Sequence, residues 1–515
     1  MISLPTLLTI VCLTATPESA DTLRIPSMEE VQRQNAWLSS SNNPVAVSMN
    51  PFHSFSVAEA KYIHYNGNLG WVQQPASSNT YVVHTESFQT FGKVSFYGKL
   101  GYKQSRNGQQ NWNGMTGNYW KAINLCDSMP GHQQAEQYQL TGAFALPLRQ
   151  RWLVGASFDY EVQLTAKETD PRNKNQWMGW TLTPGASYLC GAVRLGASLR
   201  YASRKETVNL RNMGNHISYP IFASYPLAFF KTLPQGEIAD WHYTAQEASG
   251  ALQIAINQTN LVLFQQVSGG ILRQRIESDR ILNRSEGETD GWQIMYNGEL
   301  KQHLVHTQHQ YRWQASHQRD RNYEPLQRHS NNGPYESYGR LFRSGSETTL
   351  IGLQYRYDCM HRAWQPRFSF IASMDYRQQK SSLLFFPQQY TQCLHRFTLH
   401  SKLTRSFVLR HEALFEMSVG GCYGKGGGNE FREKQLTSEE TPDIRLWQVP
   451  ALRTQAYIYE TALRWGIQAS ATYTHPMPRT SLSWFVQFSG EYEQSSCSLL
   501  HTNKKTIAAI IGILF

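Results

Sequence analysis

The chain has 515 residues, of which 40% are hydrophobic, 17% charged and 12% aromatic, and its mean hydropathy is −0.49. This polarity excludes a bundle of membrane-spanning helices, because each such helix needs about 20 consecutive apolar residues. The aromatic content excludes a disordered chain. The net charge of +10 comes from Lys and Arg residues scattered singly, which favours contact with anionic lipid or an anionic solute over nucleic-acid binding.

The N-terminus begins with an apolar stretch from Leu4 to Ala15, followed by small and turn-forming residues. This layout is typical of a secretory signal, so we expect residues 1–20 to be a signal peptide cleaved near Ala15 or Ala20. The alternative is a first strand or a buried helix. The cysteines beyond the signal show no paired CxxC spacing, so the sequence predicts no zinc site, no other metal site and no cofactor. An exported protein can form disulfides, but the sequence does not specify their pairing.

Residues 21–90 precede the regular strand pattern. They contain the stretch from Trp37 through Asn43, Pro44 and Val45, and later an alternating stretch around Tyr62. Two interpretations stay open for this region. It either folds into the interior of a barrel as a hatch, or forms a periplasmic segment with one additional strand.

From residue 91 onward, apolar and polar residues alternate with the period of two that is typical of half-buried strands. In one example, Trp152, Val154, Ala156 and Phe158 share a face opposite Ser157 and Asp159. About 16 windows show this pattern: 91–104, 136–148, 150–164, 178–190, 191–203, 244–257, 259–276, 290–301, 303–316, 347–359, 363–378, 392–404, 407–420, 455–473, 480–493 and 504–515.

The connections between these windows alternate between short and long. Short turns fall near residues 148–150, 190–191, 257–259, 301–303, 360–362, 404–406 and 475–476, and long polar loops near 105–135, 204–243, 317–346 and 421–454. Sorting of this kind is typical of an outer-membrane barrel. We therefore predict an all-β fold, an antiparallel up-and-down transmembrane barrel over residues 91–515. It has about 16 strands, in the range 14–18, with periplasmic turns and termini and extracellular loops.

Amphipathic aromatic residues bracket several apolar ribbons, as in Trp152/Tyr160 and Trp180/Tyr188. Eight residues at about 3.3 Å, tilted by about 40°, cover roughly 20 Å of the membrane normal, near the height of an apolar band. If these ribbons face lipid, the opposite strand faces line the interior. The predicted lumen-lining residues are Lys93, Lys99, Asp159, Glu161, Arg194, Arg200, Arg356, Asp358, Arg367, Asp375, Arg377, Arg410, Glu412, Arg464 and Glu491. These charges either line a wet channel or form ion pairs that hold a plug and stiffen the wall.

Enzymatic motifs are weak. His329 and Ser330 lie next to each other in a predicted loop, and neighbouring residues of a strand point to opposite faces, which does not suit a nucleophile and its base. The glycine-rich segment 424–428 has neither the spacing nor the following helix of a phosphate-binding loop, and we interpret it as a loop tip. His306 and His309 are predicted on opposite strand faces. We therefore predict no catalytic residues and no enzyme activity.

The chain ends on Phe515, and a terminal aromatic residue is typical of outer-membrane barrels, where the assembly machinery recognises it. With the Trp37 and Asn43-Pro44 stretch and the barrel layout, the chain resembles the FadL-like outer-membrane barrels, and most of all a poorly characterised barrel family from Bacteroidota. In the FadL-like barrels an Asn-Pro-Ala type element belongs to the N-terminal segment that folds into the lumen as a hatch; here Val45 replaces the alanine. The resemblance implies that Trp37, Asn43 and Pro44 belong to a hatch inside the lumen.

The sequence thus predicts a channel or transporter for a small or hydrophobic solute in the outer membrane of a Gram-negative bacterium. The alternative is a non-transporting scaffold or accessory subunit of an envelope or secretion complex, and a membrane-embedded hydrolase is the third class. The predicted partners are outer-membrane lipid and lipopolysaccharide, the barrel assembly machinery and envelope proteins. Transport predicts an open lumen or a lateral opening, with strand breaks near Pro184 or Pro366 as candidate positions.

Overall fold

The structure is a computed structural model of the chain. It describes residues 28–50, 54–71, 73–117, 119–214, 218–233, 240–279, 284–329, 335–362, 365–437, 446–477, 480, 482–497 and 500–515. The predicted signal peptide, residues 1–20, lies outside the described residues.

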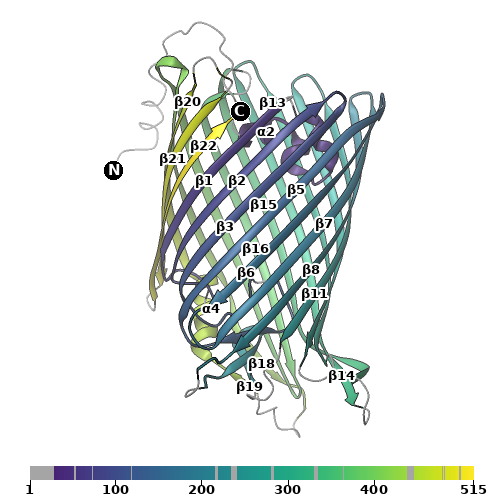
Figure 1. Ribbon diagram of the computed structural model, residues 1–515, viewed down its shortest axis with the longest axis vertical. Helices are drawn as coiled ribbons and strands as arrows, with labels where there is room; N and C mark the ends of the chain where they lie inside the picture. Colours follow the sequence, from purple (N-terminus) through teal and green to yellow (C-terminus); the bar gives the residue numbers. More distant parts are fainter. Residues whose placement is uncertain are drawn as a thin grey trace.

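Eighteen antiparallel strands form one closed barrel (Figure 1). Each strand pairs with its neighbours in chain order, and β22 pairs with β1 to close the ring. In hydrocarbon an unpaired sheet edge costs several kcal/mol per exposed backbone group. Closing the ring gives the backbone groups of both edge strands hydrogen-bond partners. The strands are β1 (Ser54–Gly67), β2 (Ser77–Phe91), β3 (Val94–Gln110), β5 (Gly131–Arg149), β6 (Trp152–Lys167), β7 (Arg172–Cys190), β8 (Val193–Arg211), β11 (Trp241–Asn257), β12 (Leu261–Ser278), β13 (Arg284–His303), β14 (Thr307–His329), β15 (Tyr335–Arg362), β16 (Gln365–Phe385), β17 (Gln388–Val408), β18 (Leu414–Gln435), β20 (Leu463–Pro476), β21 (Ser483–Cys497) and β22 (Leu500–Leu514).

The prediction of an all-β antiparallel barrel is confirmed, but the strand number is 18 rather than about 16. Each of the 16 windows overlaps one observed strand. The two missing strands are β1 and β2, so the barrel begins at Ser54 and not at residue 91. Their outward positions include small or polar residues, such as Ala58 and Ala60 on β1 and Thr85 on β2. The apolar alternation is therefore faint in these two strands.

Two rows of aromatic side chains mark the outer face. One row runs across β1 to β8 and includes Tyr62, Tyr81, Tyr102, Tyr138, Tyr160, Trp180 and Tyr201, whose neighbouring rings lie 5.1–5.5 Å apart where they touch. The other row lies nearer the short turns and contains the Trp152–Tyr188 pair, with ring centroids 4.9 Å apart. Trp180 and Tyr188 are eight residues apart on β7, which corresponds to roughly 20 Å along the membrane normal.

The two ends of the barrel differ. We call the end with the hairpin turns between β2 and β3, β5 and β6, and β7 and β8 the turn end; it is uppermost in Figure 1. The opposite end, the loop end, carries the long connections 111–130, 212–240 and 436–462, but also short ones at 168–171 and 386–387. The prediction that short and long connections alternate strictly is therefore wrong.

The predicted loop 317–346 is also wrong, because β14 and β15 continue as a long hairpin that protrudes beyond the wall (Figure 1). Ion pairs between strands lie on the loop-end part of this wall. In one of them, Arg340 Nη1 lies 2.5 Å from Asp290 Oδ2. Polar strands of this kind give no apolar alternation. The segment 424–428, predicted as a loop tip, is likewise part of strand β18.

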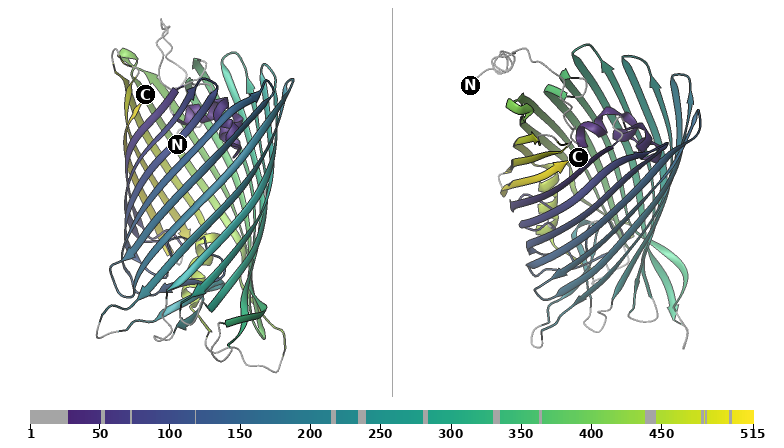
Figure 2. Two further views of the ribbon diagram at one scale, coloured as in Figure 1. Left: turned by 45° about the vertical axis from the view of Figure 1, so that its right-hand side comes forward. Right: turned by 45° about the horizontal axis from the view of Figure 1, so that its top comes forward.

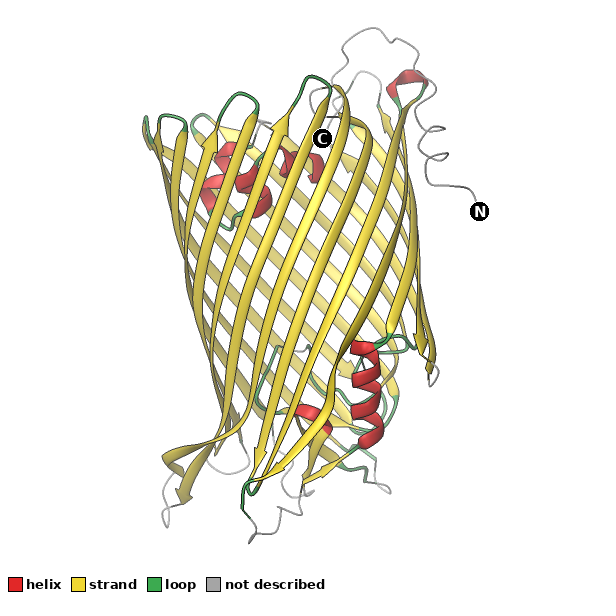
Figure 3. Ribbon diagram, turned by 180° about the vertical axis from the view of Figure 1, so that it is seen from behind, coloured by secondary structure: helices red, strands yellow, loops and turns green. Residues whose placement is uncertain are grey.

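Two groups of elements fold into the barrel. At the turn end, residues 28–50 form what we call the plug, made of α2 (Met28–Gln34), α3 (Ala36–Ser40) and the 3-10 helix η1 (Pro44–Met49) (Figures 2 and 3). At the loop end, β4 (Asn124–Asp127), β9 (Ile221–Tyr225), β10 (Phe229–Leu233) and β19 (Leu446–Gln448) form a small sheet. This sheet, the 3-10 helix η2 (Pro226–Ala228) and helix α4 (Pro450–Thr461) make up what we call the cap. No helix among the described residues is long and apolar enough to cross a membrane.

Candidate functional site

The plug is fixed to β7, β8 and β11 by one asparagine. The Asn43 side chain donates to the carbonyl oxygens of Ala186 at 3.2 Å and Ala197 at 3.1 Å, and to Gln253 Oε1 at 3.1 Å. The same side chain accepts from the Val45 backbone N–H and thereby caps η1. Pro44 occupies the first turn of η1, where its missing N–H costs nothing. Asn43 and Pro44 therefore lie inside the barrel, against β7, β8 and β11.

Trp37 fixes the plug to the same side of the barrel. Its ring is buried and packs edge-to-face on Phe264 of β12 at a centroid distance of 5.4 Å. Gly196 on β8 leaves room for it, because a Cβ at that position would lie 2.5 Å from the ring. Gly185 on β7 makes the same allowance for Asn43 and Pro44. We call these contacts with β7, β8, β11 and β12 the neutral flank of the plug.

The opposite side of the plug rests on buried charge. Glu299 on β13 is fully buried and accepts hydrogen bonds from Ser39 Oγ at 2.8 Å and Ser40 Oγ at 2.5 Å. On the wall side, Lys301 Nζ lies 3.2 Å from Glu299 Oε1 and Arg312 Nε lies 3.0 Å from Oε2. A carboxylate with this many donors stays ionised in the interior, so the plug docks onto a paired charge cluster.

Two further contacts extend this charged side. Lys301 Nζ donates to the Arg33 carbonyl oxygen of α2. Arg356 on β15 contacts Glu29 of α2 at 3.2 Å and the buried Asp358 at 3.0 Å. We call the contacts with β13, β14 and β15 the ionic flank of the plug. Arg356 and Asp358 were predicted from the sequence, whereas the alternation pattern did not single out Glu299, Lys301 or Arg312.

Most of the other predicted residues also lie on inward strand faces, where several have partners. Asp159 accepts from Thr141 Oγ1 at 2.7 Å and Glu161 accepts from Gln137 at 2.6 Å. Arg200 pairs with Glu247 at 2.7 Å, and Arg194 donates to Ser187 Oγ. By strand alternation, Lys99, Asp375, Arg377, Arg464 and Glu491 also point inward.

Three of the predicted lumen residues do not line the interior. Lys93 lies in the two-residue turn between β2 and β3. Arg410 and Glu412 lie in the 3-10 turn η4 (Arg410–Glu412) between β17 and β18. The predicted windows extended one or more residues past the strand ends, so the alternation was applied to turn residues. Arg367 lies near the turn end of β16, beside a register shift in the β15–β16 pairing.

The cap is fixed by an apolar core. Trp120, Val208, Tyr243 and Ile276 belong to one buried cluster that joins the 111–130 connection to β8, β11 and β12. A second cluster stacks Trp112 on Phe222 at 5.8 Å, with Phe230 and Trp447 beside them. No strand was predicted in this cap, because its strands are only three to five residues long.

Buried polar groups complete the attachment of the cap. Glu206 on β8 accepts from the Thr116 N–H at 2.8 Å, from Asn175 at 3.0 Å and from the Trp120 indole. Asp127 of β4 pairs with Lys167 at 2.6 Å, with both side chains about 1% exposed. Burial raises the pKa of Asp127, against the lowering effect of Lys167. The cap is thus docked through both apolar contacts and buried polar contacts.

Helix α4 reaches into the barrel from the loop end (Figure 3). Its last carbonyl groups accept hydrogen bonds from arginines of the wall: Arg396 Nη1 lies 3.1 Å from the Tyr459 oxygen, and Arg464 donates to the same oxygen. Cations at a helix C-terminus are favourable because they complement the helix dipole. The predicted window 455–473 therefore covers the end of a helix as well as strand β20.

A polar cavity of about 570 Å³ lies between the plug and the wall. Plug residues 38–42 form one side of it, and β13 to β16 form the other. The inward side chains that line it are Asn297, Arg312, Gln314, Gln354, Ser373 and Asp375. This cavity combines the plug with a polar wall and is the candidate solute site.

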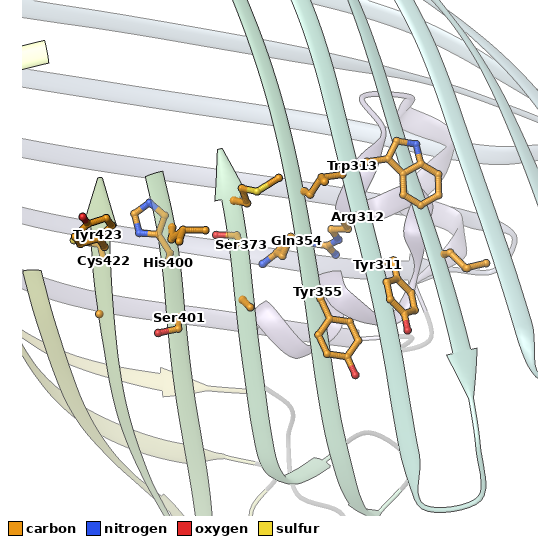
Figure 4. A pocket seen from close by; sticks show the side chains of 16 residues that line it. Tyr311, Arg312, Trp313, Gln354, Tyr355, Ser373, His400, Ser401, Cys422 and Tyr423 are labelled. Atoms are coloured by element: carbon orange, nitrogen blue, oxygen red, sulfur yellow. The ribbon is translucent and has the colours of Figure 1, made fainter. Parts of the chain in front are cut away.

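A second, larger hollow of about 1010 Å³ extends along the wall over strands β13 to β18 (Figure 4). Arg312 points inward to Glu299, so by strand alternation its neighbours Tyr311 and Trp313 point outward. These rings, with Leu353, Tyr355 and other apolar side chains, line the hollow. It is therefore an apolar depression of the outer face.

The other predicted features of the sequence can be located as well. At Pro184 the pairing of β7 with β8 is interrupted between Leu182 and Gly185, while the pairing with β6 continues. Pro366 pairs with Met360 at a register shift. Ser330 lies outside the described residues. Among the described residues, no group of His, Cys, Asp and Glu side chains is arranged to hold a metal ion.

Comparison with known proteins places the chain in a family. The model of a family of unknown function, DUF6850, matches residues 44–515. The chain belongs to this family. A search of curated proteins finds no match.

Among solved structures, the chain is similar to the ferric yersiniabactin uptake receptor FyuA from Yersinia pestis, with 7% identity, a TM-score of 0.41 and coverage of 90% of this chain and 80% of the receptor. It is similar to BauA, the ferric preacinetobactin receptor from Acinetobacter baumannii, with 8% identity, a TM-score of 0.40 and coverage of 90% and 80%. It is also similar to a mutant of the TodX monoaromatic hydrocarbon channel, with 10% identity, a TM-score of 0.32 and coverage of 92% of both chains.

Proposed function

We propose that the protein is an outer-membrane channel or transporter that passes small polar solutes through its barrel. The observation that carries the proposal is the division of the two wall faces. Large apolar side chains such as Leu252 and Ile511 are more than half exposed on the outside, as in a wall solvated by hydrocarbon. The inward face carries charged, hydroxyl and amide groups, as in a wall that faces water.

The path would run beside the plug. The contacts that fix the plug come from β3, β5 to β8 and β11 to β15, and also from β1, β2 and β22, where Phe55, Phe88 and Leu514 share an apolar cluster with Val31 and Val47 of the plug. On β16 to β20, the inward face presents small and polar side chains, including Ser373, Thr398, Lys402, Ser418 and Ser470. A polar lining of this kind favours a polar solute over the hydrophobic solute that the FadL-like resemblance implies. At the other end, the α4 side of the cap would have to move for passage.

The orientation belongs to the same proposal: the turn end and the plug face the periplasm, and the loop end faces outward. The membrane lipids, including lipopolysaccharide, would then contact the apolar outer face. Other envelope proteins would meet the loop end.

Phe515 would act as the assembly signal. Its backbone N–H donates to the Ser56 oxygen at 2.9 Å and its oxygen accepts from the Ser56 N–H at 2.6 Å. The terminal residue therefore extends the pairing of β22 with β1 that closes the barrel. We expect Phe515→Ala to lower the amount of folded protein in the membrane several-fold, because the seam would form more slowly. Heat-modifiable mobility of membrane fractions measures this, with Leu436→Ala, an exposed apolar residue at the loop end, as a control.

Uptake into proteoliposomes tests the transport proposal. The full chain and a variant lacking residues 28–49 are compared for uptake of small neutral sugars, with an empty-liposome control. We expect slow uptake by the full chain and faster uptake by the variant, because the plug obstructs the turn end. If the variant keeps the folded barrel and neither protein passes solute, the transport proposal is wrong.

A second candidate function rests on the cap. Its aromatic clusters and paired buried groups close much of the loop end with a core like that of a folded domain. A non-transporting scaffold would need such a closed barrel, and the protruding β14–β15 hairpin would supply its contact surface. In that case the full chain and the plug-deleted variant would both seal liposomes, and exchange of the hairpin would abolish assembly with envelope partners.

A further inference from the structure

The polar cavity between the plug and β13 to β16 contains inward polar side chains that have no hydrogen-bond partner among the described residues. Two other inward amides of these strands are paired: Gln310 donates to Glu299 at 2.8 Å and Asn322 donates to Ser344 at 2.8 Å. In the cavity the inward amides are not paired in this way. The contrast is between neighbouring positions on the same strands.

Five polar side chains of the cavity have no hydrogen bond or ion pair with any other described residue: Asn297, Gln314, Gln354, Ser373 and Asp375. They come from four adjacent strands and point to the same side of the wall. Each amide offers donors and acceptors, the serine offers a hydroxyl and the aspartate offers two acceptor oxygens. Convergent groups with free hydrogen-bonding capacity in a concave space are what a polar ligand site requires.

The cavity contains one charge without a partner. Arg312 is the positively charged residue among those that line the cavity. Its Nε lies 3.0 Å from Glu299 Oε2, so its charge is paired. Asp375 has no such neighbour. Arg377, two residues along β16, donates to Gln379 at 2.8 Å and lies 3.9 Å from Glu460. The cavity therefore presents hydroxyl- and amide-binding groups around a single carboxylate.

We propose that this cavity is the solute-binding site and that it takes a small hydroxyl-rich solute carrying one cationic amine. The volume of about 570 Å³ lies within the usual range for small-molecule sites, about 300–1,000 Å³. The amide groups and Ser373 bind the hydroxyls, and Asp375 binds the ammonium group. Because Ser39, Ser40 and Asn42 of the plug form the other side, the solute also contacts the element that obstructs the turn end. The inference deepens the proposed transport function and rests on it.

Binding of three six-carbon sugar derivatives of similar size to the purified full chain tests the site. Glucosamine, glucose and glucuronate differ in charge, and isothermal titration measures each dissociation constant in detergent. We expect glucosamine to bind most tightly and glucuronate most weakly. Asp375→Asn should weaken glucosamine binding about tenfold, because a hydrogen bond to a charged group is lost, and should leave glucose binding within about twofold.

Two further variants keep the test interpretable. Glu336→Gln makes the same chemical change on the exposed β14–β15 hairpin, where Glu336 pairs with Arg328, and should change none of the three constants. Ser373→Leu fills the cavity and should weaken all three sugars together. Heat-modifiable mobility confirms that each variant retains the folded barrel.

The inference is overturned if none of the three sugars binds, if glucuronate binds at least as tightly as glucosamine, or if Asp375→Asn leaves glucosamine binding unchanged. Failure of the transport proposal looks different. In that case the amine preference persists in titrations while proteoliposomes take up no solute. Uptake without an amine preference would instead overturn the site and leave transport standing.

Discussion

The two flanks of the plug hold it by different chemistry. On the neutral flank, Asn43 bonds to backbone oxygens of two strands and Trp37 packs on Phe264. On the ionic flank, Glu299 is the hub of a cluster that joins Ser39 and Ser40 to Lys301 and Arg312. The strength of the neutral contacts varies little with salt. Removing one charge from a buried ion cluster is strongly destabilising, because it leaves the opposite charge without a partner. We therefore expect a single substitution on the ionic flank to release the plug more readily than one on the neutral flank.

Removal of the hub should have the largest effect. We expect Glu299→Ala to destabilise the docked plug by about 3–5 kcal/mol, because the fully buried Lys301 would lose its carboxylate partner, as would Arg312 at the edge of the cavity. Protease sensitivity of the N-terminal segment in the folded barrel measures the release. Glu299→Gln keeps acceptors for the two serines and should be less severe; equal protection of the wild type and Glu299→Ala would contradict the role of the cluster.

Loss of the asparagine on the neutral flank should have an intermediate effect. We expect Asn43→Ala to cost about 1–3 kcal/mol, because it removes the three hydrogen bonds that the side chain donates and the one that it accepts from Val45, and leaves carbonyl oxygens of β7 and β8 without that donor. The same protease assay reports it. Asn42→Ala is the matched control, since Asn42 is exposed at the cavity and makes no such contact. A variant at position 43 that is no more sensitive than the control would show that Asn43 does not anchor the plug.

The outermost ion pair should have the smallest effect. Glu29 pairs with Arg356, but its side chain is 73% exposed, and exposed pairs contribute about 0–1 kcal/mol. We expect Glu29→Gln to change plug protection by less than about 1 kcal/mol, with the difference disappearing at 1 M salt. An effect as large as that of Glu299→Ala would mean that the charged side is not centred on Glu299.

The barrel itself could be predicted from the sequence to a large extent. Apolar alternation identifies a strand wherever its outer face meets lipid, and each of the 16 windows overlaps an observed strand. Apolar alternation is lost where that face is not apolar. Strands β1 and β2 carry small and polar outward residues, and the far parts of β14 and β15 are covered by cross-strand ion pairs.

The site was harder to predict. Asn43, Pro44 and Trp37 carried a recognisable motif, but the cap depends on contacts between segments more than 80 residues apart, such as Trp120 with Glu206. Alternation placed Asp375 and Arg356 on the inner face, yet it does not distinguish a paired charge from a free one. Glu299 and Lys301 did not stand out, because they are two charged residues in a polar stretch and their importance comes from the plug that covers them.

Conductance in planar bilayers shows whether the plug obstructs a water-filled path through the barrel. The full chain, Glu299→Ala and Asn43→Ala are inserted separately, and single-channel currents are recorded at equal salt and voltage. We expect small currents for the full chain and currents several-fold larger for Glu299→Ala, with Asn43→Ala between them. Tight seals for all three proteins, with the barrel folded in each, would contradict the claim that the plug obstructs a water-filled path.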